Sequence, residues 1–242
     1  MNDDADEPAN DELTPATAPP PDELVEAIAT RAASWRRRIA ELTDREVRLV
    51  AVTKGHPVEV ALAAAAAGFD DLGENYAQEL LSKIAAWPPS SSAPRWHFIG
   101  RLQSNKVRQL AGHVALWQTV DRASLAGEIA RRDPGAQVLV QLDLAGIEGR
   151  GGCAPAEAPA LVEHCRGLGL DVRGLMGVGV PGPPEDSRPG FRLLDSMASE
   201  LGLQERSMGM SGDAEVALSE GATIVRIGSA LVGPRLVPPR AG

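Results

Sequence analysis

The sequence predicts an α/β protein built as a single closed (β/α)8 barrel of the TIM type. Eight short β-rich runs each precede a helical pattern or, for the last run, a short closing segment. The chain has 242 residues, and eight such units need roughly 200. No change of composition marks a second domain, and serial alternation predicts parallel strands joined by right-handed crossovers. An open doubly wound sheet is the alternative.

The first half of the chain contains an opening helix and four predicted strand–helix units. The opening helix begins at Pro21-Asp22, and its apolar residues recur at helical spacing as far as Leu42. Runs rich in β-branched, aromatic and aliphatic residues predict the strands, while Gly68 and Pro88 end two of the helices. The predicted strands are 47–53, 69–72, 95–99 and 115–120, and the predicted helices are 58–67, 75–86, 104–110 and 122–131.

The second half repeats the same alternation. A glycine-rich stretch separates the fifth strand from its helix, and a proline-rich loop separates the sixth strand from its helix. A closing segment follows the eighth strand. The predicted strands are 137–144, 172–178, 203–207 and 223–227, and the predicted helices are 155–167, 191–201 and 213–221.

The net charge of −9 comes almost entirely from the N-terminal region. Residues 1–24 carry eight acidic residues and no basic residue, whereas the rest has 25 acidic residues against 24 lysines and arginines. A nearly neutral body gives no electrostatic reason to expect nucleic acid as a partner. We expect residues 1–22 to form a disordered, acidic, proline-containing tail, residues 23–236 the barrel, and residues 237–242 a short proline-containing C-terminal tail.

The composition also predicts the environment of the protein. No apolar run reaches the roughly 18 residues of a membrane span, and the N-terminus is acidic rather than basic and apolar. We therefore expect a cytoplasmic protein, with a monomer as the default state. Two cysteines do not make a disulfide framework. Cys153, His164 and Cys165 lack the spacing of metal ligands, so no metal site is expected.

Lys54 follows the first predicted strand, at the rim where barrels of this type carry their active sites. The chain has 21 arginines but three lysines, so a lysine at a strand end is a candidate for special chemistry. A lysine amine can form an imine, whereas the guanidinium of arginine stays protonated and cannot. The alternative is a surface lysine in a loop. Lys83 and Lys106 are interpreted as helix-surface residues.

The loops after the seventh and eighth predicted strands are suited to bind an anion. Barrels often bind phosphate there through backbone N–H groups. Residues 208–213 include Gly209 and Ser211, and Gly228 and Ser229 follow the last strand. Ordinary turn and N-cap chemistry is the alternative explanation. A lysine imine together with a phosphate site indicates pyridoxal phosphate, or else a sugar phosphate bound by a class I aldolase.

Five ordered motifs lie at the ends of the first, second, third, seventh and eighth predicted strands. They are Val50-Ala51-Val52-Thr53-Lys54, Gly73-Glu74-Asn75-Tyr76, Trp96-His97-Phe98-Ile99-Gly100 with Leu102-Gln103-Ser104-Asn105-Lys106, Ser207-Met208-Gly209-Met210-Ser211 and Val225-Arg226-Ile227-Gly228. In this order they resemble the pyridoxal phosphate homeostasis protein family, also called the YggS/PROSC family. The resemblance spans residues 24–235, which is nearly all of the predicted barrel.

The resemblance implies a barrel similar to the N-terminal domain of alanine racemase, without the second, β-rich domain of that enzyme. It implies that the chain binds pyridoxal 5'-phosphate and acts in vitamin B6 homeostasis, with no established catalytic turnover and no catalytic residue. The implied partners are pyridoxal-phosphate-dependent apo-enzymes. Lys54 would form a Schiff base with the cofactor, and Arg226 would face its pyridine nitrogen. The other implied site residues are Ser207, Ser211, Gly228 and Ser229 at the phosphate and Asn75 and His97 along the ring.

A pyridoxal-phosphate-dependent amino-acid racemase is the alternative function. An arginine at the pyridine nitrogen disfavours protonation there, so the ring is a poorer electron sink. Racemisation also needs two opposed acid/base groups, and the single tyrosine, Tyr76, lies in the motif of the second strand. His97 is a candidate base, although a structural histidine within its strand is an equal alternative. We therefore expect a cofactor carrier rather than an enzyme.

Overall fold

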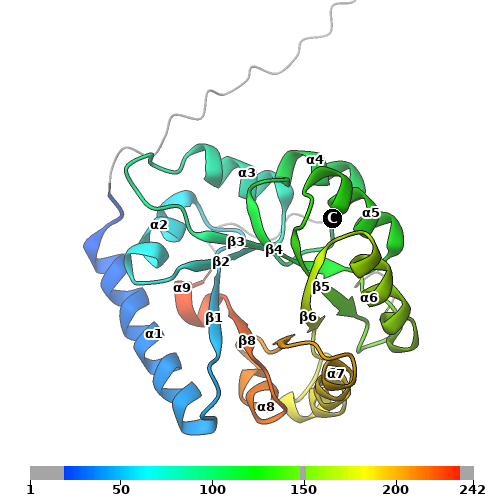
Figure 1. Cartoon of the computed structure of the whole chain (residues 1–242). Helices are drawn as coiled ribbons and strands as arrows, with labels where there is room; N and C mark the ends of the chain where they lie inside the picture. Colours follow the sequence, from blue (N-terminus) through cyan, green and yellow to red (C-terminus); the bar gives the residue numbers. More distant parts are fainter. Residues whose placement is uncertain (1–18, 148–150, 235–242) are drawn as a thin grey trace, which may run out of the picture.

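The computed structural model describes residues 19–147 and 151–234, and its strands close into one parallel barrel. Each strand pairs with the next along the chain, and β8 pairs with β1 to complete the ring. Figure 1 shows the helices arranged around the outside of the strands. The predicted (β/α)8 TIM barrel is confirmed, and the open doubly wound sheet is excluded. The predicted tails lie outside the described residues, except for residues 19–22.

The strands alternate with helices in the order that the sequence predicts. The strands are β1 Arg48–Val52, β2 Asp71–Glu74, β3 Arg95–Phe98, β4 Val114–Val120, β5 Gln137–Leu142, β6 Asp171–Gly177, β7 Glu205–Ser207 and β8 Ile224–Ile227. The α-helices are α1 Asp22–Leu42, α2 Val58–Ala66, α3 Ala77–Ala85, α4 Ser104–Leu110, α5 Ala123–Arg132, α6 Ala158–Gly167, α7 Arg188–Glu200, α8 Ala214–Ser219 and α9 Ser229–Val232. Short 3-10 turns, Pro155–Glu157 and Pro184–Ser187, precede α6 and α7.

The second strand starts two residues later than predicted. Gly68 has a φ of 87°, a left-handed conformation that ends α2, and the N–H of Phe69 donates to the carbonyl of Ala64 at 3.1 Å. Phe69 is therefore part of the turn that closes the helix. As a result β2 runs to Glu74, which is buried within the sheet, and Asn75 is the first residue beyond it.

Helix α7 begins three residues earlier than predicted. Its first turn contains Pro189, whose missing N–H has no helical partner to lose at that position. The proline-rich segment therefore leads directly into a helix through the 3-10 turn Pro184–Ser187. At the end of the barrel, the predicted closing segment contains the short helix α9.

Among the residues that the structure describes, apolar side chains form two separate cores. The larger core lies between the sheet and the helices, and Trp117, Phe98 and Phe191 are its largest fully buried side chains. The smaller core lies inside the barrel. Both cysteines are buried free thiols. Within the described ranges, no helix is both long and apolar enough to cross a membrane. The inner core consists of Val50, Leu116, Leu139, Met176 and Ile224.

Candidate functional site

The predicted site residues that follow the strands lie at the rim formed by the carboxyl ends of the strands. Lys54 follows β1, Asn75 follows β2, and Gly228 follows β8. The register pairs Ala51 of β1 with Ile227 of β8, so the loops after these strands are neighbours. A Cβ atom placed on Gly228 would lie 3.7 Å from the carbonyl oxygen of Val52. The amine-bearing loop and the last glycine loop therefore share one side of the mouth.

Helix α3 fastens the backbone on both sides of Lys54, and we call these two bonds the α3 clamp. The ammonium of Lys83 donates to the carbonyl oxygen of Thr53 at 2.7 Å. The N–H of Gly55 donates to the Glu79 carboxylate at 2.9 Å. Glu79 and Lys83 are four residues apart on α3, so one face of that helix holds both bonds. Lys54 itself is partly buried.

Lys83 is not a surface residue, so its sequence-based interpretation is wrong, whereas Lys106 is exposed as expected. The Lys83 side chain is 4% exposed and forms an ion pair with Glu74, which is fully buried. The Thr53 hydroxyl also donates to Glu74, at 2.6 Å. Burial raises the pKa of Glu74, and the adjacent Lys83 partly offsets that rise. The pair packs directly behind the loop that carries Lys54.

The loop after β7 is joined to strand β8 through the backbone. The N–H of Arg226 donates to the carbonyl oxygen of Gly209 at 3.0 Å. The N–H of Met210 donates to Asp213 at 2.6 Å, which closes this loop on itself. Ser211 and Ser229 are exposed after β7 and β8. In the described chain no side chain caps α9, which begins at Ser229, so its leading N–H groups can meet an anion.

Arg226 lies inside the barrel and is 3% exposed. Its guanidinium donates to the Ser207 hydroxyl at 2.6 Å and to the carbonyl oxygen of Gly177 at 2.8 Å. Burial lowers the pKa of Arg226 to about 10, and the charge of Asp213 opposes this change. The guanidinium is therefore still protonated at neutral pH. The structure thus holds a buried cation in the strand that leads to Gly228.

Asn75 carries an unsatisfied acceptor. Among the described residues, its buried Oδ1 atom has no hydrogen-bond partner. The neighbouring loop leaves no room for a side chain at Gly100, because a Cβ there would lie 2.0 Å from the carbonyl oxygen of Asn75. A buried orphan acceptor costs free energy unless a ligand or water satisfies it. The unpaired Oδ1 atom of Asn75 is therefore suited to contact a bound group.

Ser207 and His97, like Arg226, have their polar atoms engaged inside the barrel. The Ser207 hydroxyl accepts from Arg226 and donates to Gln118 at 2.6 Å. The two ring nitrogens of His97 contact Gln118 at 2.7 Å and Asp71 at 2.9 Å. His97 is 2% exposed, and its two hydrogen bonds agree with the structural alternative for this residue.

Sequence reasoning missed Gln118, Lys83 and Glu79. Gln118 could have been suspected because it is a polar residue in an otherwise mostly apolar strand, Val114–Val120. Lys83 shares the buried face of α3 with Leu80, three residues earlier, and that spacing is visible in the sequence. Within residues 19–147 and 151–234, no group of three or more His, Cys, Asp or Glu could hold a metal ion.

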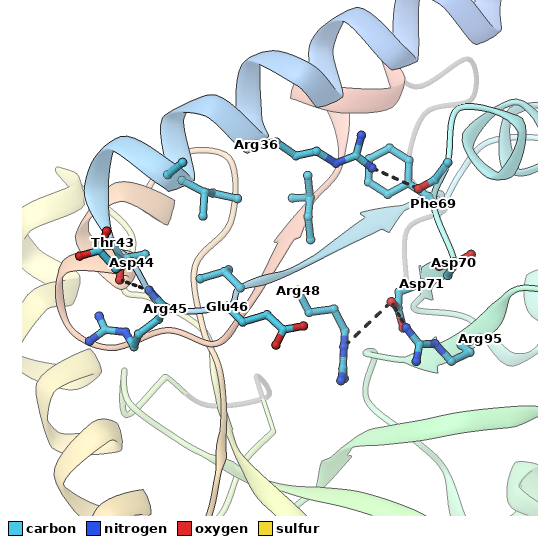
Figure 2. Close-up of a pocket in the computed structure, with 15 residues that line it drawn as sticks. Arg36, Thr43, Asp44, Arg45, Glu46, Arg48, Phe69, Asp70, Asp71 and Arg95 are labelled. Atoms are coloured by element: carbon cyan, nitrogen blue, oxygen red, sulfur yellow. Dashed lines mark hydrogen bonds and ion pairs between the residues drawn. The ribbon is translucent and has the colours of Figure 1, made fainter.

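A cavity of about 590 Å³ lies at the opposite mouth, between α1 and the first residues of β1, β2 and β3. Figure 2 shows Arg48 and Arg95 directed toward Asp71 at its edge. Arg95 donates to Asp71 at 2.6 Å. Lys54 does not line this cavity. The cavity is therefore separate from the candidate site.

The barrel and its lysine-bearing rim define a class, the barrels of the alanine racemase N-terminal domain type. The family model described as "Alanine racemase, N-terminal domain" matches residues 25–235. Within that class, the chain belongs to the pyridoxal phosphate homeostasis protein family. The protein of that name from Pseudomonas aeruginosa is 39% identical over 223 residues, covering 88% of this chain and 96% of the relative.

Solved structures agree with this assignment. PipY of Synechococcus elongatus, solved with pyridoxal phosphate bound, is 33% identical with a TM-score of 0.77, covering 85% of this chain and 100% of PipY. Alanine racemase of Corynebacterium glutamicum matches 86% of this chain with a TM-score of 0.68, covering 61% of the racemase. Its identity is 17%, so that match shows the fold alone.

Proposed function

We propose that this chain binds pyridoxal 5'-phosphate reversibly at the carboxyl-end rim and acts in the homeostasis of that cofactor. The observation that supports the proposal most is that Lys54 follows β1, next to the loop after β8, at the same rim as the loop after β7. An amine that reacts with an aldehyde and N–H groups that bind a phosphate then face one mouth. The Pseudomonas relative is named a pyridoxal phosphate homeostasis protein, and PipY was solved with pyridoxal phosphate bound, which supports the proposal.

Each rim residue has a proposed role. The Lys54 amine forms a Schiff base with the cofactor aldehyde. The Arg226 guanidinium faces the pyridine nitrogen, and Asn75 uses its unpaired Oδ1 along the ring. Ser207 and His97 act through Arg226, because their own polar atoms are engaged within the barrel. The phosphate is held by the backbone and side chains of Ser211, Gly228 and Ser229.

The electrostatics of the site disfavour amino-acid chemistry. When bound, pyridoxal phosphate supplies an electron sink that stabilises a carbanion, and protonation of the pyridine nitrogen strengthens that sink. A charged, buried Arg226 disfavours that protonation. Racemisation would also need a second acid/base group opposite Lys54. The single tyrosine, Tyr76, is 52% exposed in the loop just after β2. We therefore favour a cofactor-binding protein over a racemase.

The absence of turnover is testable with deuterium. We expect deuterium from the solvent to enter the Cα position of free alanine no faster with the loaded protein than with an equal concentration of free cofactor. Nuclear magnetic resonance of the amino acid measures the rate. Incorporation at catalytic rates that disappears in Lys54→Ala would establish the racemase instead.

Binding is tested with a charge placed in the phosphate loop. We expect Ser229→Asp to weaken pyridoxal phosphate binding at least about tenfold, because like charges repel at the phosphate. The matched control is Ser91→Asp, which adds the same charge at an exposed serine before β3, on the opposite rim. Titration by visible absorbance measures both affinities. Equal weakening by both variants would contradict the proposed phosphate site.

The open rim also fits release of the cofactor to other proteins. Ser211 and Ser229 are exposed at the mouth, so the proposed phosphate end remains accessible. We propose that pyridoxal-phosphate-dependent apo-enzymes receive the cofactor from this rim.

A further inference from the structure

Four hydrogen bonds join five side chains into a continuous chain through the barrel, and we call it the interior chain. Arg226 Nη1 lies 2.6 Å from Ser207 Oγ, and Ser207 Oγ lies 2.6 Å from Gln118 Oε1. Gln118 Nε2 lies 2.7 Å from His97 Nδ1, and His97 Nε2 lies 2.9 Å from Asp71 Oδ1. Ser207 is the last residue of β7 and Asp71 the first of β2. The interior chain therefore runs from one mouth of the barrel to the other.

The chemistry of the groups decides which partner donates in each bond, and in every bond the donor is the group nearer to Arg226. Arginine has no acceptor, so Arg226 donates and Ser207 Oγ accepts. The Ser207 hydroxyl hydrogen then goes to Gln118 Oε1, which turns the amide NH2 of Gln118 toward the histidine.

The direction of these bonds sets the protonation pattern of His97. Its Nδ1 atom accepts from Gln118, so the ring proton is on Nε2, where it is donated to Asp71. The bonds thus specify a neutral ring with one particular tautomer.

The interior chain is buried from Arg226 to His97. Ser207 and Gln118 have no exposed surface, and His97 and Arg226 are almost fully buried. Breaking one bond would leave a donor or acceptor unpaired in the barrel. The free-energy cost is larger than that of breaking the same kind of bond at an exposed position. Because each group has a single orientation that satisfies both neighbours, a change at one position reorients the others.

A charged carboxylate fixes the far end. Burial alone would raise the pKa of Asp71, but His97 and Arg95 together more than offset it, so the pKa of Asp71 lies below its usual value. Arg95 donates to the second carboxylate oxygen at 2.6 Å, and Arg48 approaches the same oxygen to 4.0 Å, as Figure 2 shows. Asp71 is therefore a permanent acceptor at neutral pH, and the interior chain starts from a cation and ends on an anion.

We propose that Gln118 and His97 are positioning residues that hold the Arg226 guanidinium in the orientation with which it meets the pyridine nitrogen of the cofactor. This inference rests on the proposed function, which supplies its ligand. The donor–acceptor direction of the bonds can be measured in the protein without ligand. The direction of the bonds and the positioning role can therefore be tested separately.

The first measurement reads His97 in the unliganded wild-type protein. Nitrogen–proton correlation spectra distinguish the two neutral tautomers and the doubly protonated ring, and His97→Asn identifies the signal among the four histidines. We expect a neutral ring protonated on Nε2. A ring protonated on Nδ1, or on both nitrogens at neutral pH, would overturn the order of the bonds, whether or not the protein binds cofactor.

The second measurement reads the cofactor. Gln118→Met keeps the length of the side chain but cannot bond Ser207 or His97, and Gln118→Glu places an acceptor where His97 Nδ1 needs a donor. We expect both variants to bind pyridoxal phosphate about fivefold more weakly or worse, with a shifted visible absorption band. In Gln118→Glu we also expect His97 to become doubly protonated. Gln109→Glu, at an exposed position of α4, is the matched control and should behave as wild type.

The outcomes separate the two proposals. If wild-type protein binds no cofactor, the proposed function fails, while the His97 spectrum still decides the order of the bonds. If wild-type protein binds cofactor and both Gln118 variants keep its affinity and spectrum, the positioning role is wrong and the proposed function stands. Circular dichroism verifies that each variant is folded, and Gln118→Met alone suffices if Gln118→Glu does not fold.

Discussion

Lys54→Ala is expected to give no covalent adduct when the protein is mixed with pyridoxal phosphate and reduced with borohydride. The amine that condenses with the aldehyde is removed, and alanine offers no nucleophile. Lys83 is not expected to replace it, because its ammonium is paired with Glu74 and bonded to the Thr53 carbonyl. Intact-protein mass spectrometry measures the adduct, and peptide mapping locates it. Wild-type protein should carry one phosphopyridoxyl group on Lys54.

The matched control is Lys106→Ala, which removes an exposed lysine from α4. This variant should be labelled as fully as wild type. Lys54→Arg keeps the positive charge but should also give no adduct, because guanidinium does not form an imine. A wild-type adduct found on Lys83 or Lys106 and absent from Lys54 would overturn the assignment.

Lys83→Met should lower the free energy of unfolding by about 3–5 kcal/mol, since it leaves the Glu74 carboxylate buried without its cation. Methionine preserves most of the volume, so lost packing contributes little. Urea denaturation followed by tryptophan fluorescence measures the change. Lys106→Met, at an exposed position, should change stability by less than about 0.5 kcal/mol.

The loss in Lys83→Met should become smaller as the pH falls. Burial raises the pKa of Glu74, and removal of Lys83 raises it further. An acid whose pKa is higher in the folded state than in the unfolded state stabilises the fold below its unfolded value, and that contribution disappears as the pH rises through its folded value. The stability difference from wild type should therefore narrow from pH 8 to about pH 5. A difference that is constant across this range would contradict a buried, ionised Glu74 as the cause.

A double variant tests the same pair from the other side. Glu74→Gln in the Lys83→Met background removes the buried charge, so it should recover part of the lost stability. The recovery should be incomplete, because the Thr53 carbonyl still lacks the ammonium that it accepts from in wild type.

The barrel was predictable because it depends on patterns that recur along the whole chain. Alternation of strands and helices specifies parallel neighbours, and the carboxyl ends of parallel strands meet at one rim. The placement of Lys54, Asn75 and Gly228 at that rim follows without any knowledge of side-chain contacts. Their roles toward a cofactor remain predictions, which the experiments above address.

One prediction error is local, at the end of a helix, whereas the others depend on contacts between different elements of the barrel. Phe69 reads as a strand residue, yet the left-handed Gly68 draws it into the end of α2. Lys83 reads as a surface lysine because a single sequence does not show that Glu74, nine residues earlier, lies buried beneath it. The role of Gln118 depends on its hydrogen bonds to His97 and Ser207, which lie on two other strands. Pairings of this kind depend on three-dimensional proximity.

The α3 clamp has a thermodynamic consequence for ligand binding. A loop held at the carbonyl of Thr53 and at the N–H of Gly55 has already lost most of its conformational entropy when the protein folds. The lysine is thus preorganised, and association with an aldehyde need not order the segment again. Severing either anchor should therefore slow capture of the aldehyde even where the amine itself is untouched.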